Sequence, residues 1–476
     1  MNVATVIVVI IALGTVAFGS VYPWAFIPLF VAASLIGIAG LRRAGLRPEL
    51  RPVAAGLLLV CAAAAAQLVP MPPVMAARIS PATVDVLRAY DLVFADPDAG
   101  WRPLSINPRS TAVAVLSLYA LSMYVLGLPG LLGHRALRSL PGFIAMFAVP
   151  LALYGIFTRE HNNGLIYGFW QPQDGGGGNQ FGPFVNRNHF GGWMLMTLGV
   201  LIGSLFGQFE GALRDTGGRR SRRLAWLSSS SANSLLLTGV VVILGVIGIF
   251  WSLSRSSIIS LAAAVLLFAW LASRRRRLGA TRRILALASL GAALVAGLAW
   301  RGPTRLLVWF QDDRNLLSRF DAWRDAWDVI RTFPLAGTGL NTFGDAMLFY
   351  QQRNPGFHMA QAHNDYLQLA AEGGALVVVP AIVAALLLAR AIRNNLRIAR
   401  AESRGYWIRA GATIGLVAVA VQEVFEFSLQ IPVNAFLFAT LAAIALSPVV
   451  VSRSTSAVVS RDTMLLPRSS AGVSLS

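Results

Sequence analysis

Hydrophobic positions along this chain form long runs that are separated by short polar segments. A helix of about twenty apolar residues can cross the hydrocarbon core of a bilayer, because it satisfies its backbone hydrogen bonds internally. Runs of this kind occupy approximately residues 3–19, 22–41, 53–69, 111–132, 140–157, 190–208, 232–251, 254–273, 282–300, 374–392, 407–424 and 432–449. The pattern predicts an all-α, polytopic membrane protein with about 12 transmembrane helices.

The polar segments between these runs differ greatly in length. Only a few residues separate the seventh and eighth runs, so these two helices are expected to form a tight hairpin. Long polar segments lie at 70–110, 158–189 and 301–373, and the last of these is a large loop between helices 9 and 10. We therefore expect one transmembrane domain over 1–449. The Ser- and Arg-rich residues 450–476 are expected to form a disordered tail.

Composition supports the membrane assignment. The chain is 56% hydrophobic and only 13% charged, whereas soluble domains carry about 25% charged residues. Its formal net charge of +19 would otherwise suggest nucleic acid as a partner. With the N-terminus in the cytoplasm, however, most of the 40 basic residues fall in inner segments, as the positive-inside rule requires. The charge thus predicts a multi-pass protein with both termini in the cytoplasm, and nucleic-acid binding is not expected.

Several classes of chemistry are disfavoured by what the sequence lacks. Every basic residue is Arg, so Schiff-base lysine chemistry and a lysine-containing phosphate loop are excluded. The DGGGG run at 174–178 is therefore interpreted as a flexible loop. The lone Cys61 cannot form an intrachain disulfide and is expected to pack in an apolar run. The vicinal pair Asp312–Asp313 would direct its carboxylates apart, so no metal is expected there.

Histidine is scarce and concentrated on the predicted outer face. The outer histidines are His161, His189, His358 and His363, whereas His134 lies inside. A single loop histidine is more often a solvated surface residue than a functional one. The segment AHNDYLQLAAEGGAL is the most informative. It predicts a short helix that opens at His363–Asn364 and ends or bends at Gly373–Gly374. A neutral imidazole there can accept a proton near neutral pH, although a helix cap is an equally good interpretation.

Four arginines lie on the same predicted face. Arg187 lies in GPFVNRNHFGG, Arg255 in SLSRSS, and Arg319 and Arg324 in SRFDAWRDAW. An interfacial arginine often only extends toward lipid headgroups. The guanidinium group is also the side chain best suited to bidentate contact with phosphate. Arg255 is the strongest candidate, because it interrupts a nearly continuous apolar stretch.

Residues 320–330 predict an amphipathic helix. Phe320, Trp323, Trp327 and Ile330 share one helical face, and charged residues occupy the rest of the surface. Such a helix can lie in the membrane interface, and packing on the helical bundle is an equally good alternative. In the eleventh run, Glu423 and Glu426 share a face near the outer end. They suggest either a proton relay or, more economically, a pair with an outer arginine.

These segments, in this order and on one membrane face, resemble the O-antigen ligase/polymerase superfamily of bacterial envelope glycosyltransferases. The resemblance covers most of the chain. It rests on the long loop between the ninth and tenth spans and on PLSINPRST, FVNRNHFGG, SLSRSS, RFDAWRDAWDVIRTFPLAGTGLNTF and AHNDYLQLAAEGG.

The resemblance implies a GT-C-like membrane enzyme without cofactor or metal. Such enzymes move a glycan from undecaprenyl diphosphate to an acceptor hydroxyl on the periplasmic face. The family's essential loop histidine corresponds to His363. Its arginines correspond to Arg187, Arg255 and Arg319, with Arg324 as the alternative to Arg319. The polyprenyl tail would lie against apolar outer walls, guided by the helix that carries Trp323 and Trp327.

The acceptor is left open by the sequence. Lipid A–core, a growing polysaccharide and a protein hydroxyl all fit. The sequences FVNRNHF and HNDYLQ are more similar to those of family members found with exopolysaccharide genes than to those of lipopolysaccharide ligases. A twelve-helix transporter or flippase of lipid-linked glycans is the main rival function. Such carriers place functional charges near the bilayer midplane, whereas here the polar residues gather in outer loops. A non-catalytic scaffold in a glycan-assembly complex is a third possibility.

Overall fold

The computed structural model describes residues 2–90, 100–161, 163–172, 179–216, 226, 228–274, 291, 314–353 and 356–449. Within these residues the secondary structure is helical, and the only β-structure is three isolated bridges. This confirms the all-α prediction. The α-helices are α1 (Val3–Val16), α2 (Pro23–Ala44), α3 (Arg51–Ala66), α4 (Pro73–Ile79), α5 (Pro81–Tyr90), α6 (Pro108–Leu131), α7 (His134–Glu160), α8 (Arg187–Thr216), α10 (Ser230–Ser252), α11 (Arg255–Ser273), α14 (Arg314–Thr332), α15 (Phe343–Tyr350), α16 (Asp365–Ile398), α17 (Ser403–Gln422) and α18 (Pro432–Leu446).

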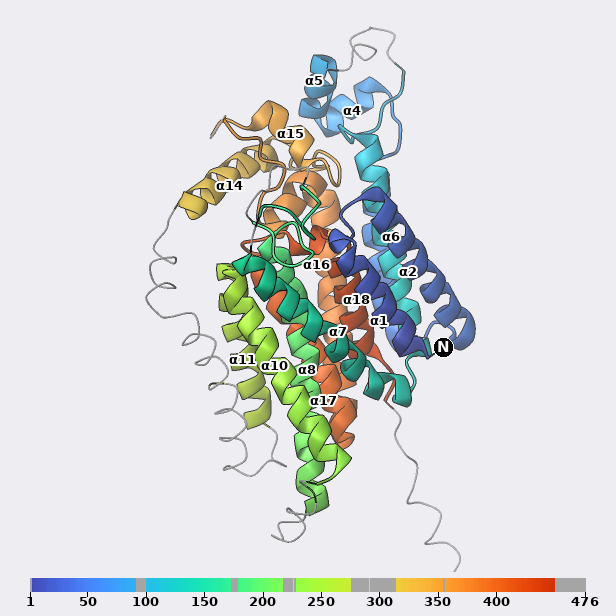
Figure 1. The fold of residues 1–476 in the computed structure, drawn as a ribbon. Helices are drawn as coiled ribbons and strands as arrows, with labels where there is room; N and C mark the ends of the chain where they lie inside the picture. Colours follow the sequence, from blue (N-terminus) through green and yellow to red (C-terminus); the bar gives the residue numbers. More distant parts are fainter. Residues whose placement is uncertain are drawn as a thin grey trace, which may run out of the picture.

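Most of these helices form a bundle (Figure 1), and many large apolar side chains on it are exposed. Among the described residues, eight helices are long and apolar enough to cross a membrane, and α1 and α18 are shorter apolar helices. Leu35, Met146, Leu237 and Leu386 project from different helices and are all more than half exposed. A surface of this kind requires lipid rather than water around it.

Each predicted span from the described part of the chain coincides with a helix. The predicted ninth span at 282–300 lies almost entirely outside the described residues, so the count of twelve stays a prediction. The DGGGG run, Asp312–Asp313, the first part of the 301–373 loop and the tail at 450–476 also lie outside them.

Helix α8 lies at the centre of the bundle, and 94% of an apolar 18-residue stretch of this helix is buried. It packs tightly against α17 through small residues on both helices. A Cβ atom added to Gly203 would lie 2.3 Å from the carbonyl oxygen of Trp407, and one added to Gly199 would lie 2.7 Å from that of Gly411. Such close approach is typical of glycine-lined helix pairs in membranes. It fixes the start of α8 beside the end of α17.

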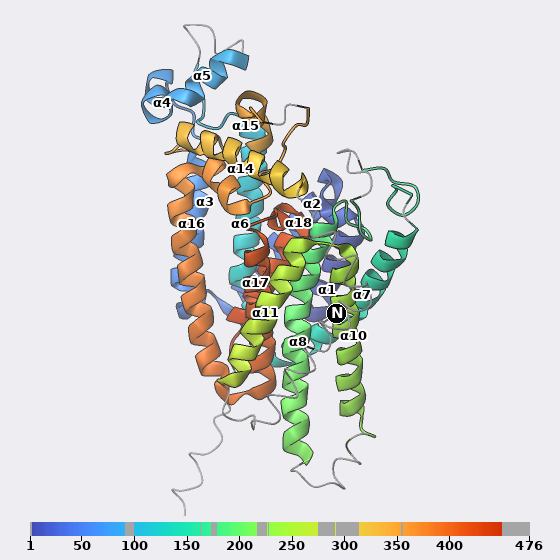
Figure 2. The same cartoon turned by 90° about the vertical axis from the view of Figure 1, so that its left-hand side faces the viewer.

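One end of the bundle is covered by a layer that consists of α4, α5, α14 and α15, which we call the capping layer (Figure 2). Helix α14 crosses this end instead of running along the bundle. Its buried side packs in an apolar cluster that includes Val86, Ala326, Phe343 and Met347. The end that carries this layer is called the capped end below.

Helix α16 bends at Gly374, whose φ of 54° and ψ of −167° are non-helical. The bend confirms the prediction made from Gly373–Gly374. The turn that follows α14 satisfies the backbone groups that the bend exposes. The N–H of Ala375 donates to Pro334 O and the N–H of Leu376 donates to Leu335 O, both at 2.9 Å. The capping layer is thus joined to the bundle through main-chain hydrogen bonds.

Two buried polar side chains strengthen this junction. The Nε2 of Gln67, at the end of α3, donates to the carbonyl oxygens of Ala336 (2.7 Å) and Glu372 (2.8 Å). The carboxylate of Glu372 accepts hydrogen bonds from the N–H groups of Asn341 and Phe343, at the start of α15. Three segments that are distant in sequence are therefore held in one arrangement, which places α14 above the beginning of α16.

The sequence left open whether α14 lies in the membrane interface or packs on the bundle. Ala322, Ala326 and Val329 are fully buried, whereas Phe320 and Trp327 are 44% and 47% exposed. Small side chains let the helix approach its neighbours closely, and this outweighs the larger apolar area of the aromatic residues. Helix α14 therefore packs on the bundle with one face and leaves an aromatic face partly open.

Candidate active site

A buried carboxylate forms the centre of the candidate site. Glu426 lies in the connection between α17 and α18 and is 1% exposed. Its Oε1 accepts hydrogen bonds from Arg319 Nη2 at 2.5 Å and from Ser256 Oγ at 3.3 Å. Its Oε2 lies 3.9 Å from Nδ1 of His363. Side chains from the start of α11, from α14, from the segment before α16 and from the α17–α18 connection thus meet at the capped end.

The expected pairing of an outer arginine with one of the two glutamates is confirmed in the Arg319–Glu426 pair. The placement of both glutamates on the eleventh span was wrong. Helix α17 ends at Gln422, and Glu426 lies beyond it. The connection turns back into a short 3-10 helix at Ser428–Gln430, and this turn directs the carboxylate into the site.

His363 adopts an uncommon backbone conformation next to a capped helix. Its φ is 51°, in the left-handed region, where histidine is rare but tolerated. The side chain of Asn364 accepts hydrogen bonds from the N–H groups of Tyr366 and Leu367, both at 3.0 Å, and so caps α16. Asn364 therefore performs the capping role that was one interpretation of His363, and the imidazole is directed to Glu426 instead.

The imidazole of His363 is held by aromatic packing. Its ring lies edge-on to Phe427, with centroids 5.0 Å apart, and Phe427 also packs edge-on to the buried His189 at 4.7 Å. The Nδ1 atom of His363 is buried and forms no hydrogen bond within the described part of the chain. It faces a carboxylate slightly beyond hydrogen-bond distance, so a small movement would make the contact.

The environment keeps Glu426 ionised. Burial raises the pKa of this carboxyl, but the guanidinium of Arg319 and the nearby His363 outweigh burial and lower the pKa to about 2. A fixed negative charge beside an imidazole orients the ring and stabilises the imidazolium that forms when the ring accepts a proton. The pair therefore has the geometry of a general base with a positioning carboxylate.

Arg187 and Arg255 reach the same region from two helix N-termini. Arg187 begins α8 and lies within electrostatic range of Arg255, Arg319 and Glu426. Arg255 begins α11. The two helix starts touch, since a Cβ atom on Gly191 would lie 1.9 Å from Ser257 Oγ. Arg159 also lies within electrostatic range of Arg187, and the carboxyl groups of Asp365 and Glu423 lie near Glu426. The arginines at the two helix N-termini form the cationic side of this region, and that side favours an anion.

Arg324 is not part of this cluster. Its side chain is 68% exposed and forms an ion pair with Asp321 at 3.4 Å on the surface of α14. The structure therefore brings Arg319 to Glu426 and His363 and leaves Arg324 outside. Two other histidines lie away from the cluster. His134 pairs with Glu402 at 3.1 Å, and His161 stacks on Phe157.

Some members of the site carried no usable signal in the sequence. Gln422 donates from Nε2 to Asn188 O (2.9 Å) and to Ser257 Oγ (3.0 Å), and so ties α17 to the starts of α8 and α11. Ser256 and Phe427 contact the reactive groups directly. Isolated Ser, Gln and Phe residues are common in membrane helices, and only their long-range contacts distinguish these three.

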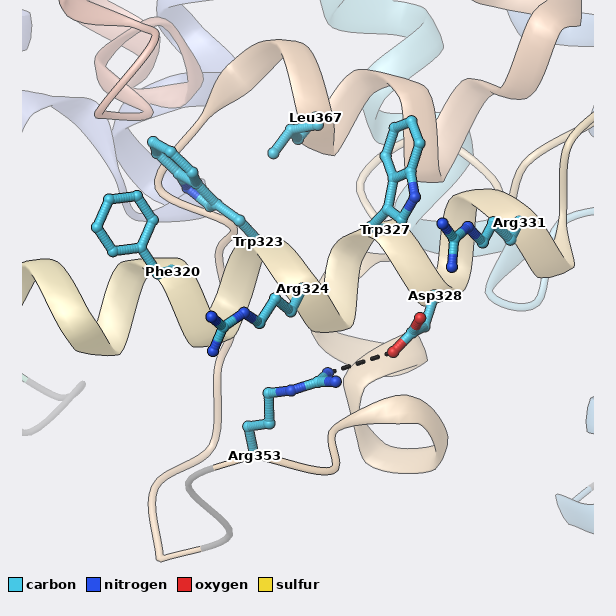
Figure 3. Close-up of a pocket in the computed structure, with 8 residues that line it drawn as sticks. All are labelled: Phe320, Trp323, Arg324, Trp327, Asp328, Arg331, Arg353 and Leu367. Atoms are coloured by element: carbon cyan, nitrogen blue, oxygen red, sulfur yellow. Dashed lines mark hydrogen bonds and ion pairs between the residues drawn. The ribbon is translucent and has the colours of Figure 1, made fainter.

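A groove of about 430 Å³ runs along α14 next to the cluster (Figure 3). Its apolar lining is Phe320, Trp323, Trp327 and Leu367. Its charged lining is Arg324, Asp328, Arg331 and Arg353. Within the described residues, no group of three or more His, Cys, Asp or Glu side chains is arranged to hold a metal ion.

The fold and the site define a polytopic, helical membrane protein with a partly buried His–carboxylate–Arg cluster at one end. Residues 240–382 match the model of a family described as O-antigen ligase. This match confirms the resemblance to the O-antigen ligase/polymerase superfamily, whose members have a membrane glycan-transfer role. The matched residues include Arg255, Arg319 and His363, whereas Arg187 and Glu426 lie outside them. No curated protein matches the chain.

Proposed function

We propose that this protein moves a glycan from undecaprenyl diphosphate to an acceptor hydroxyl at the periplasmic face of the bacterial inner membrane. The convergence of His363, Glu426 and Arg319 at the capped end, within reach of Arg187 and Arg255, carries the proposal. A base with its positioning carboxylate lies beside a pair of arginines at two helix N-termini. This combination suits transfer from a phosphate-linked donor to a hydroxyl.

The arginines act on the donor. When the bond between the sugar C1 and the diphosphate oxygen breaks, negative charge develops on the departing undecaprenyl diphosphate. Arg187 and Arg255 stand at the N-termini of α8 and α11, where the helix dipoles add to their charge. Fixed donors of this kind stabilise the leaving group as its charge grows. Since diphosphate is already a good leaving group, little acid catalysis is needed.

His363 acts on the acceptor. Its imidazole accepts the hydroxyl proton as the acceptor oxygen forms its bond to the sugar C1. Glu426 stabilises the resulting imidazolium from the Nδ1 side, 3.9 Å away. Arg319 holds Glu426 through the 2.5 Å contact and so acts through it on His363. Lipid A–core and a growing polysaccharide are both suitable acceptors.

The distribution of charge supports a periplasmic position for the capped end. At the opposite end, Arg47 donates to Leu446 O and Arg409 donates to Pro448 O, near the end of α18. The Arg-rich segments that follow α2 and precede α17 lie at that opposite end. By the positive-inside rule, the opposite end faces the cytoplasm.

The test is glycan transfer by membranes from a deletion strain that expresses each variant. His363→Ala and Arg255→Ala are expected to lower the transfer rate by about 100-fold or more. Arg88→Ala, which removes an exposed arginine of α5, is the matched control and is expected to transfer at the wild-type rate. Wild-type transfer by both site variants would refute the proposal. Glycan transport without an acceptor would support a transporter instead.

A further inference from the structure

We propose that the groove along α14 binds the glycan next to its reacting end and prefers glycans that carry negative charge. The inference rests on the proposed function, because it treats the groove as an extension of the transfer site. It departs from the expectation that the helix with Trp323 and Trp327 guides the polyprenyl tail.

The aromatic side of the groove suits a sugar ring. In Figure 3 the rings of Trp323 and Trp327 stand on the same side of α14 as Leu367. Trp327 is 47% exposed, so a large part of its ring face is available to a ligand. The electron-rich face of an indole ring attracts the C–H groups on the apolar face of a pyranose. The exposed ring of Trp327 can therefore stack on a sugar.

The charged side of the groove distinguishes between possible ligands. The lining contains Arg324, Arg331 and Arg353 together with one acid, Asp328. Arg324 pairs with Asp321 outside the lining, so Arg331 is the lining arginine that forms no ion pair within the described residues. Arg353 is held by Asp325 (2.5 Å) and Asp328 (3.2 Å), and Arg331 lies over the ring of Trp327 at 5.6 Å. Covering four charged side chains with hydrocarbon would be costly, which argues against a polyprenyl chain. Guanidinium groups instead pair with carboxylate or phosphate groups on acidic sugars.

The groove is continuous with the reaction centre. Trp323 is one helical turn from Arg319 and packs on Phe425, the residue before Glu426, with ring centroids 5.9 Å apart. Leu367 lies in the first turn of α16, four residues after His363. From Trp323 to Arg331 the helix extends about 12 Å, at 1.5 Å per residue. A glycan that reacts at His363 would therefore continue along α14 across these rings.

Calorimetric binding of lipid-free saccharides to the full-length protein in phosphatidylcholine nanodiscs tests this inference. Tetragalacturonate, an anionic probe, is expected to bind more tightly than neutral maltotetraose. Trp327→Ala should weaken tetragalacturonate binding about tenfold, and Trp327→Phe should restore part of it. Trp101→Ala removes an exposed tryptophan outside the groove and should bind as wild type does. Arg331→Ala should reduce both the preference for tetragalacturonate and its weakening by salt.

Several outcomes would overturn the inference. These are failure of both saccharides to bind, equal affinity for the two, and unchanged affinity in Trp327→Ala. Loss of saccharide binding when phosphatidylglycerol is added to the nanodisc would assign the groove to a lipid headgroup instead. Since the probes contain no diphosphate, binding and transfer are separate readouts. If wild-type protein binds tetragalacturonate but never transfers glycan, the proposed function fails and the groove assignment remains.

Discussion

Glu426 is the residue on which the geometry of the candidate site depends. It contacts Arg319 directly, accepts a hydrogen bond from Ser256 and faces His363. Replacing it with glutamine keeps the shape of the side chain but removes its charge. His363 would then lose the group that stabilises its protonated form, and Arg319 would lose its buried partner.

We expect Glu426→Gln to lower the transfer rate about 100-fold, within the usual contribution of a positioned acid–base group. The measurement is the initial rate of glycan transfer, normalised to the amount of folded protein in the membrane. Glu49→Gln, at a glutamate whose side chain is 68% exposed and far from the site, is the matched control and should behave as wild type. A Glu426→Gln rate within twofold of wild type would contradict the positioning role.

The same residue predicts a pH dependence of stability. The pKa of Glu426 is about 2 in the folded protein, below its ordinary value of 4.5. A depressed pKa stabilises the folded state above the unfolded pKa, and this contribution disappears as the pH falls through the folded pKa. The shift corresponds to about 3 kcal/mol, as an order of magnitude.

The stability difference between wild type and Glu426→Gln in detergent should therefore shrink as the pH is lowered from about 4.5 toward 2. Thermal unfolding midpoints at a series of pH values measure this difference. A difference that stays constant across the window would show that the carboxylate is not held ionised by its neighbours.

Residue-level prediction from the sequence succeeded where a local motif carried the signal. His363 stands in a recognisable segment, and Arg319 and Glu426 were expected to belong to an outer charge cluster. Gln422 and Phe427 could not be found in this way, because their roles arise from contacts with residues more than 60 or even 200 positions away. Of the two arginine alternatives, the structure favours Arg319. Helical spacing places Arg324 on a different face.

At the scale of elements, the bend in α16 is what positions His363. The bend needs a glycine at residue 374, since its φ and ψ fall in a region that only glycine adopts readily. A Cβ atom there would lie 2.5 Å from the backbone nitrogen of Gly337 and 2.6 Å from the carbonyl of Leu335. The turn after α14 therefore cannot stay in place if residue 374 gains a side chain.

Gly374→Ala is expected to destabilise the protein by about 3 kcal/mol or more, from backbone strain and overpacking together. Its yield from membranes and its unfolding midpoint in detergent are the measurements. Gly356→Ala, at a position where an added Cβ meets nothing within 4 Å, is the control and should be neutral. Equal stability of the two variants would mean that the bend does not depend on glycine.

Helix α14 shows that a hydrophobic pattern does not always predict which face of a helix packs against its neighbours. Its pattern correctly predicted an amphipathic helix. The pattern left open whether the helix lies in the membrane interface or packs on the bundle, and the packing that forms uses Ala322 and Ala326. Alanine contributes little to a hydrophobicity pattern and yet permits the closest approach between helices. The junction through Gln67 and Glu372 was also beyond sequence reasoning, because its hydrogen bonds go to backbone atoms of distant segments.

For the whole molecule, the hydrophobic runs predicted the helices of the described part well, because a bilayer imposes strict length and composition limits. The arrangement of these helices was not predictable. Nothing in the runs indicated that α8 would be central or that α4, α5 and α15 would join α14 in one layer (Figure 2). Those features depend on small-residue packing and on buried polar contacts.

The proposed orientation predicts the accessibility of single cysteines. In a Cys61→Ser background, Gly356→Cys lies at the capped end and Gly133→Cys lies at the start of α7. A Cβ atom added at either position meets no other atom within 4 Å. A membrane-impermeant maleimide added to spheroplasts should label residue 356 and should label residue 133 only after permeabilisation. The reverse pattern would invert the topology and would place the candidate site in the cytoplasm.

The most direct test of the central claim is the stoichiometry of the reaction in proteoliposomes of purified protein. The substrates are an undecaprenyl-diphosphate-linked glycan and an acceptor with a free hydroxyl. We predict that the wild-type protein releases one undecaprenyl diphosphate for each glycan joined to the acceptor, and that His363→Ala releases none above background. If glycan crosses the membrane without joining the acceptor, or if His363→Ala matches wild type, the assignment of this site to glycan transfer is contradicted.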